Sequence, residues 1–237
     1  MLSPAAVAAL ILVIGIVVLI IASVPVAIAI GLPSLFAAMA VLGPENAAQA
    51  VAQRMFTGTN SFTLLAIPFF VLAGSLMNSG GIATRLIDAA KVLVGRMPAS
   101  MANTNIAANG LFGAVSGAAV AAASAVGTVM TPKMKEEGYS RAYSAAVNVA
   151  SAPAGMLIPP SNTFIVYSLV SSTSIAALFM AGVGPGLLWI LACVIVGTWL
   201  ARKENYKREQ IHPTFKQSLV VLLRALPSLL MIVIVVG

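Results

Sequence analysis

Charged side chains are scarce in this sequence, and their scarcity identifies the solvent in which the chain folds. Asp, Glu, Lys and Arg make up 8% of the 237 residues, whereas an ordinary globular domain carries about 25%. Hydrophobic residues account for 60% of the chain, and the mean hydropathy is +1.02. This composition excludes an ordinary soluble domain and predicts an all-α polytopic membrane protein.

Cysteine and histidine are nearly absent, which removes most catalytic and metal chemistry. Cys193 is the only cysteine, so no disulfide forms within the chain, and His212 is the only histidine. There is no His-Glu-x-x-His motif, no Cys/His cluster and no pair of intramembrane aspartates. Ser116 has no positioned base to make it a nucleophile. The sequence therefore predicts neither an enzyme nor a transition-metal site.

The net charge of +7 comes from cations that lie in short loops beside apolar segments. This placement indicates membrane topology, with the lipid bilayer and not nucleic acid as the partner. The N-terminus lacks the basic region of a signal peptide, since the first cation is Arg54.

Apolar stretches of the length needed to cross a bilayer recur along the chain. They are residues 5–21, 26–42, 62–77, 174–200 and 217–237, with a polar segment at 45–61. Residues 80–96 instead alternate apolar and charged side chains at helical spacing, which predicts an amphipathic helix along the membrane surface.

Two further apolar stretches are interrupted where a continuous helix would be expected. Small residues around Ser116-Gly117 divide residues 103–130 into arms of about a dozen residues, too short for two crossings, which favours a re-entrant hairpin. Pro159-Pro160 breaks the run at 142–170. Backbone groups freed inside a bilayer are tolerated only in protein or in a cavity. Two such breaks therefore indicate an ion or substrate site, and a transporter.

The basic loops predict an orientation. If the loop at 201–216 is cytoplasmic, counting spans backwards places the basic segments 131–141 and 80–96 on the same side and the N-terminus on the periplasmic side. A single crossing by residues 103–130 would leave one basic set outside, so this partition also favours the hairpin.

Several short blocks, in order along the chain, resemble the large membrane subunit of tripartite ATP-independent periplasmic (TRAP) transporters. They are Ala-Ile-Pro-Phe-Phe-Val-Leu-Ala-Gly at 66–74, Gly-Ile-Ala-Thr-Arg-Leu at 81–86, Val-Ser-Gly-Ala-Ala at 115–119 with Gly127, Pro-Lys-Met at 132–134 with Gly138-Tyr139, and Ile-Pro-Pro-Ser at 158–161. Together they extend the resemblance from about residue 5 to the end.

The resemblance implies an elevator-type transporter in a bacterial inner membrane, built from two inverted repeats that each hold a re-entrant hairpin and a broken helix. It also implies sodium coupling, organic-anion substrates such as sialic acid or C4-dicarboxylates, a small membrane subunit and a periplasmic substrate-binding protein. Since the family is about twice as long and inverted repeats come in pairs, we expect this chain to be the N-terminal half, with the second repeat absent. Ala118 and Ala119 stand where the family often has another hydroxyl.

The expected division of the chain follows this scheme. It comprises scaffold spans at 1–80, an amphipathic arm at 81–98, a transport element at 99–173, a span at 174–200, a cytoplasmic basic loop at 201–216, and the start of a further span at 217–237.

The two breaks supply the candidate site residues. We expect sodium to be bound by Ser116, Gly117, Ala118, Pro159, Pro160 and Ser161, although close packing of Gly110, Gly113 and Gly117 and a simple proline kink would explain the same residues. The candidates for substrate binding or cavity lining are Asn105, Asn109, Asn148, Ser161 and Asn162. Interhelical hydrogen bonds would explain the three amides at 105, 109 and 148 equally well.

Two other functions fit the same sequence. One is a sodium- or proton-coupled anion carrier of a related elevator family that needs no binding protein. The other is a non-transporting membrane scaffold, which would show no sodium dependence.

Overall fold

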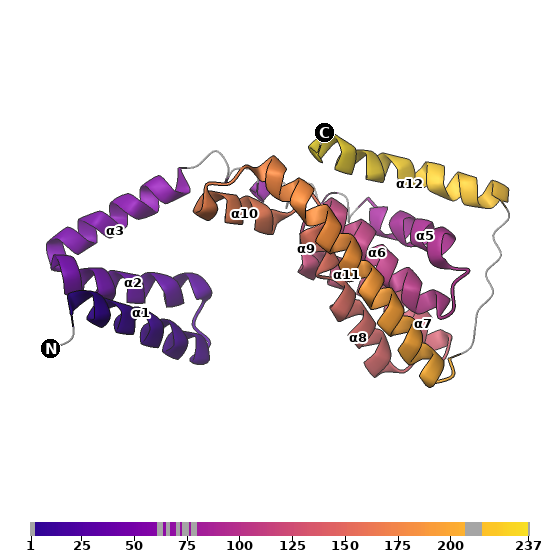
Figure 1. Cartoon of the computed structure of the whole chain (residues 1–237), viewed down its shortest axis with the longest axis horizontal. Helices are drawn as coiled ribbons and strands as arrows, with labels where there is room; N and C mark the ends of the chain where they lie inside the picture. Colours follow the sequence, from indigo (N-terminus) through magenta and orange to yellow (C-terminus); the bar gives the residue numbers. More distant parts are fainter. Residues whose placement is uncertain are drawn as a thin grey trace. The chain divides into compact units, whose positions relative to one another are not determined.

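The computed structural model describes residues 3–60, 80–206 and 215–236, together with Leu64, residues 67–69, Leu72 and Leu76. Every regular element in these residues is an α-helix, which confirms the predicted all-α class. The chain divides into two compact units, Met1–Phe62 and Thr63–Gly237 (Figure 1). Most of the predicted span at 62–77 lies outside the described residues, as does His212; the functional division of the chain stays a prediction.

The first unit contains α1 (Pro4–Ile21), α2 (Val26–Leu42) and α3 (Pro44–Thr59). Helix α1 begins where Ser3 Oγ accepts a hydrogen bond from the Ala6 N–H at 3.3 Å. It packs against α2 at Gly15, where an added Cβ would lie 2.9 Å from Pro33. The polar segment after α2, for which the sequence indicates no element, forms α3.

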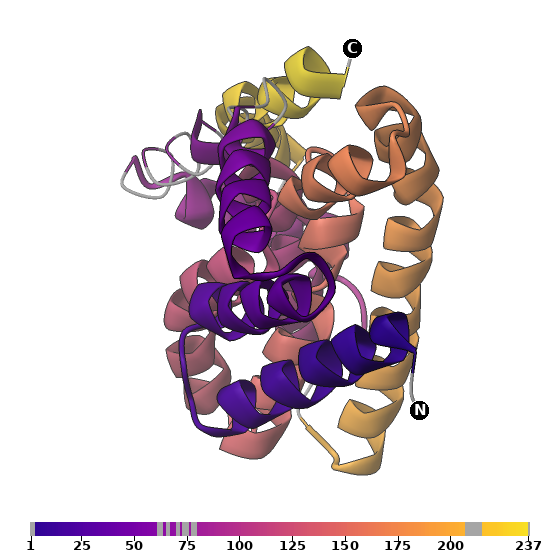
Figure 2. The same ribbon diagram turned by 90° about the vertical axis from the view of Figure 1, so that its left-hand side faces the viewer.

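The second unit is arranged around α6. Its helices are α5 (Ile82–Val94), α6 (Ser100–Ser116), α7 (Ala119–Glu136), α8 (Arg141–Ser151), α9 (Ala154–Leu157), α10 (Asn162–Ser171), α11 (Ile175–Lys203) and α12 (Phe215–Val236). Helix α6 contacts α5, α7, α8, α9, α11 and α12, and 15 of its 17 residues are buried. Helix α11 lies lengthwise along α6, α8 and α9 (Figures 1 and 2).

Helix α5 is amphipathic, as its sequence pattern indicates. Leu86 and Ile87 are buried within the second unit, whereas Arg85 and Asp88 are exposed. The buried side packs against α6 and α12. Its placement along a membrane surface stays a prediction.

The predicted length of the hairpin arms was wrong. Helices α6 and α7 contain 17 and 18 residues instead of about a dozen, because α6 begins at Ser100 and α7 continues through Pro132 to Glu136. At 1.5 Å per residue each arm is about 26 Å long, close to the hydrocarbon thickness of about 30 Å. Arm length therefore no longer favours a re-entrant hairpin, and that prediction now depends on the charge pattern and the resemblance.

The stretch 142–170 is interrupted at two places. The predicted interruption at Pro159-Pro160 separates α9 from α10. A second interruption, which sequence reasoning missed, separates α8 from α9 at Ala152 and Pro153.

Two of the described helices, Pro4–Ile21 and Ile175–Lys203, are long and apolar enough to cross a membrane, and Val26–Leu42 and Asn162–Ser171 are shorter apolar helices.

Candidate functional site

The turn between α6 and α7 lies against the break between α9 and α10. Helix α6 ends at Ser116 because Gly117 adopts a left-handed conformation, with φ of 65°, that glycine tolerates without strain. The Asn162 N–H, at the start of α10, donates a hydrogen bond to the Gly117 carbonyl at 3.2 Å. A Cβ added to Gly117 would lie 3.0 Å from the Pro160 carbonyl oxygen. The structure thus brings the two predicted interruptions together.

A second contact between glycines fixes the hairpin to the broken helix. A Cβ on Gly113 would lie 2.1 Å from the Gly155 Cα, and one on Gly155 would lie 2.4 Å from the Gly113 Cα. Helices α6 and α9 therefore touch backbone to backbone, and neither position accepts a side chain without movement. Sequence reasoning identified Gly113 as a packing glycine but missed its partner.

Two glycines of helix α11 pack closely against the break between α9 and α10. A Cβ on Gly182 would lie 2.4 Å from the Leu157 carbonyl oxygen, and one on Gly186 would lie 2.6 Å from Ile158 Cγ1. Sequence reasoning missed both residues. Their four-residue spacing, which is common at close helix contacts in membranes, is the signal that would have found them.

Four helix ends converge at this site, and they differ in polarity. Helix α6 and the single turn α9 end in carbonyl oxygens. Helices α7 and α10 begin with N–H groups, of which those of Asn162 and Phe164 already donate to Gly117 and Ser161. Helix carboxyl ends favour cations and helix amino ends favour anions. One small region can therefore interact with both signs of charge.

The side chains at the break add further oxygen atoms. Asn162 Oδ1 is buried and has no hydrogen-bond partner among the described residues. Ser161 is fully buried; its Oγ donates to the Met156 carbonyl at 2.5 Å and accepts from the Phe164 N–H at 3.3 Å. Ser116 Oγ lies 3.4 Å from the Ala118 carbonyl oxygen, a long contact. Amide, hydroxyl and carbonyl oxygens are the donors that hard cations prefer.

The three predicted amides form a separate buried network. Asn109 Nδ2 lies within hydrogen-bond distance of Asn105 Oδ1 at 2.9 Å, Asn148 Oδ1 at 3.0 Å and Ser151 Oγ at 2.9 Å. Asn148 Nδ2 donates to the Ala123 carbonyl at 2.8 Å. These bonds connect α6, α7 and α8 about two helical turns before the hairpin tip. In the structure the amides form interhelical hydrogen bonds; a role in lining a cavity stays a prediction.

Paired helix interruptions in a helical, strongly apolar chain are typical of membrane transporters. The family model described as "Tripartite ATP-independent periplasmic transporter, DctM component" matches residues 13–237. The chain belongs to this family of membrane-embedded permease components.

Named relatives agree with this assignment. The chain is 54% identical over 216 residues to the uncharacterized protein YgiK of Salmonella typhimurium, covering 90% of this chain and 49% of that protein. It is 39% identical over 217 residues to the sialic acid TRAP transporter large permease protein SiaM of Vibrio cholerae, with 88% and 49% covered. It is 36% identical over 202 residues to the C4-dicarboxylate TRAP transporter large permease protein DctM of Rhodobacter capsulatus, with 79% and 46% covered. The chain spans about half the length of these relatives.

Proposed function

We propose that this chain forms the first repeat of the large permease subunit of a sodium-coupled symporter for a small organic anion. The observation that carries the proposal is the hydrogen bond from Asn162 N–H to the Gly117 carbonyl, because it joins the two helix breaks. The names of SiaM and DctM favour sialic acid or a C4-dicarboxylate as the substrate class. A small membrane subunit and a periplasmic substrate-binding protein would complete the transporter.

Sodium would be held between the hairpin tip and the Pro-Pro break. The candidate ligands are oxygen atoms of Ser116, Gly117, Ala118, Pro159, Pro160 and Ser161. Asn162 Oδ1 is buried and has no partner in the part of the chain that the structure describes, which supports a fit to a hard cation, since such an atom is costly to leave without a partner. We therefore add Asn162 to the ligand candidates.

The anion would bind beside the sodium, near the amino ends of α7 and α10. In α10 the Asn162 and Phe164 N–H groups already donate to Gly117 and Ser161. The dipoles of the two helices would therefore supply most of the attraction for negative charge there. A bound sodium ion would strengthen the attraction. Occupancy of the two ligands would then be coupled, as symport requires.

Transport would follow an elevator mechanism in which residues 99–173 move and the spans within 1–80 stay fixed. The backbone contact between Gly113 and Gly155 supports movement of the hairpin and the broken helix as one body. The basic loops favour a periplasmic N-terminus and a cytoplasmic segment at 201–216.

The test is uptake of labelled sialic acid and C4-dicarboxylates into proteoliposomes that contain the full-length subunit, its small partner and the binding protein. Uptake is measured with and without an inward sodium gradient, for the native protein and for Ser116→Ala and Asn162→Ala. Ser124→Ala is the matched control, because Ser124 is exposed on α7. We expect the sodium concentration for half-maximal uptake to rise about tenfold in the site variants, equivalent to about 1.4 kcal/mol, and to stay unchanged in the control.

The alternatives predict other results. Sodium-driven uptake without the binding protein would favour the related carrier family. Uptake that ignores the sodium gradient would overturn the coupling, and an absence of transport with every tested anion and partner would favour a scaffold.

A further inference from the structure

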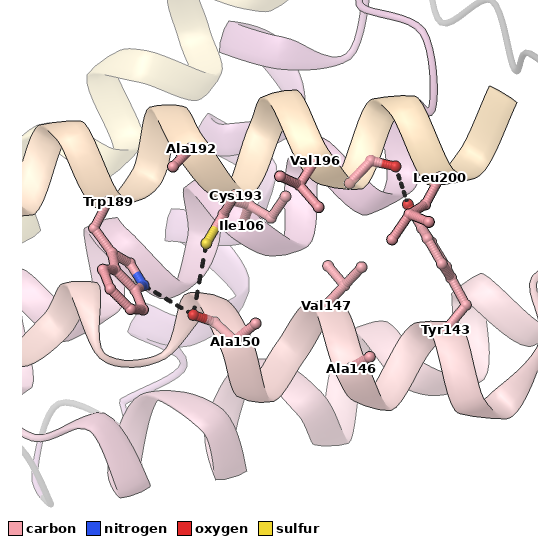
Figure 3. A pocket seen from close by; sticks show the side chains of 11 residues that line it. Ile106, Tyr143, Ala146, Val147, Ala150, Trp189, Ala192, Cys193, Val196 and Leu200 are labelled. Atoms are coloured by element: carbon pink, nitrogen blue, oxygen red, sulfur yellow. Dashed lines mark hydrogen bonds between the residues drawn. The ribbon is translucent and has the colours of Figure 1, made fainter. Parts of the chain in front are cut away.

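An apolar groove of about 310 Å³ runs between α8 and α11, apart from the helix breaks. Figure 3 shows Ala146, Val147 and Ala150 of α8 facing Trp189, Cys193 and Val196 of α11. The volume falls at the lower end of the range for ligand pockets, about 300–1,000 Å³.

The polar groups around the groove already bind one another. Trp189 Nε1 donates to the Ala150 carbonyl at 2.9 Å, and the Tyr143 hydroxyl donates to the Gly197 carbonyl at 2.7 Å. Cys193 Sγ also contacts the Ala150 carbonyl, at 3.6 Å. The lining therefore offers hydrocarbon surface, so a polar or charged molecule placed here would lose hydration without gaining a partner. This excludes the transported anion and favours an aliphatic chain.

One end of the groove is basic. Leu200 lines the groove two residues before Arg202 and three before Lys203 of α11, and Tyr143 lines it two residues after Arg141 of α8. The Lys203 ammonium lies over the Trp199 ring, 5.8 Å from its centroid, and Arg202 also lines a neighbouring recess beside Pro98 and Ala99. All three cations are exposed. The same end also holds Glu204, whose carboxylate accepts a hydrogen bond from the Tyr206 hydroxyl.

The two ends of α8 and α11 are held together beside these cations. The rings of Tyr139 and Tyr206 lie 4.5 Å apart between centroids, those of Tyr143 and Tyr206 lie 5.2 Å apart, and the Ser140 N–H donates to the Tyr206 hydroxyl. Arg141 therefore lies at the same end of the groove as the last turn of α11.

The length and the charge of the groove fit one class of ligand. From Trp189 to Leu200 the groove follows twelve residues of α11, a rise of about 16 Å, along a helix long and apolar enough to span a membrane. Basic residues at the end of a membrane helix attract anionic lipid headgroups, and Arg and Lys pair well with phosphate. We propose that the groove binds one acyl chain of an anionic phospholipid from the bilayer, with its phosphate at Arg141, Arg202 and Lys203. The proposal requires only that the chain lies in a membrane, so it does not depend on sodium coupling or on the substrate.

The test uses the full-length transporter in phosphatidylcholine vesicles with trace phosphatidylglycerol that carries a photoactivatable diazirine in one acyl chain. Cross-linked residues are mapped by mass spectrometry. We expect labelling concentrated at 146–150 and 189–197. Filling the groove with Ala146→Trp should reduce this labelling about tenfold. Ala192→Phe, which fills the groove from the α11 side, should reduce it as well. Ala177→Trp, at an exposed position of α11 outside the groove, should leave the labelling unchanged.

The headgroup is tested with a matched diazirine phosphatidylcholine probe. Phosphatidylglycerol should label the groove more strongly, and the paired change Arg202→Gln and Lys203→Gln should remove that preference, whereas Arg54→Gln should keep it. Melting temperature and elution volume verify that each variant is folded. Three results would each overturn the proposal. They are equal labelling on all sides of α11, equal labelling by the two lipids, and a groove that stays unlabelled because another part of the transporter covers it.

Discussion

Helices α1 and α6 have nearly the same length but opposite relations between sequence and burial. Helix α1 has 18 residues, almost all apolar, and none is buried. Helix α6 has 17 residues that include three asparagines, two serines and a threonine, and 15 of them are buried. In a soluble protein the more apolar helix would lie inside. Here apolar side chains mark surface suited to lipid, whereas small and polar residues mark contact between helices.

Phe112→Ala should cause the largest loss of stability among these tests, because Phe112 of α6 is only 2% exposed. Removing a buried aromatic ring leaves a cavity and costs about 3–5 kcal/mol. Phe36→Ala is the matched control, since Phe36 of α2 is 55% exposed. The measurement is the free energy of unfolding of the full-length subunit in mixed micelles. Equal losses in the two variants would show that exposure in the structure does not distinguish these helices.

Gly113→Ala should have the next largest effect. Its new methyl group would overlap the Gly155 backbone, and overpacking of this kind costs about 1–3 kcal/mol. Gly184→Ala in α11 is the control, because nothing lies within 4 Å of its added Cβ. We expect a lower melting temperature and reduced uptake for the first variant only. Unchanged melting of Gly113→Ala would contradict the close contact of α6 with α9.

Asn109→Leu should have the smallest effect of the three, and it tests the comparison directly by making α6 more like α1. Although the change increases hydrophobicity, it leaves Asn105 Oδ1 and Asn148 Oδ1 without the Asn109 donor, so we expect a loss of about 1–2 kcal/mol. Asn46→Leu changes an exposed amide of α3 and should cost less. Stabilisation by Asn109→Leu, read from the same unfolding titration, would show that apolarity matters more than the hydrogen bonds.

The sequence predicted the local features well. The interruptions at Ser116-Gly117 and Pro159-Pro160 and the amphipathic pattern of α5 each follow from the backbone preferences of the residue types or from helical spacing. For the same reason, the two positions expected to form the site could be identified before the structure was known.

The long-range features were harder to predict. The sequence around Gly155 and Gly182 does not indicate which segment either residue contacts, and these contacts are what make the two glycines important. The arms of the hairpin were underestimated because α7 continues beyond Pro132 into a charged segment. Helix α3 was missed because it has no apolar periodicity strong enough to separate a polar helix from a loop.

Helix α11 is fastened to the rest of its unit at several points along its length. Gly182 and Gly186 contact the break. Near the middle of the helix Trp189 donates a hydrogen bond to the Ala150 carbonyl, and near the far end the Gly197 carbonyl accepts one from the Tyr143 hydroxyl. With 29 residues, α11 is about 43 Å long. Pro185 lies inside it, between the two glycines at the break, and a proline in a helix interior removes a backbone hydrogen bond and favours a bend. A displacement at the break would therefore be divided between bending at Pro185 and movement of the segment beyond it, and a reporter beside Tyr206 would measure the part that reaches the far end.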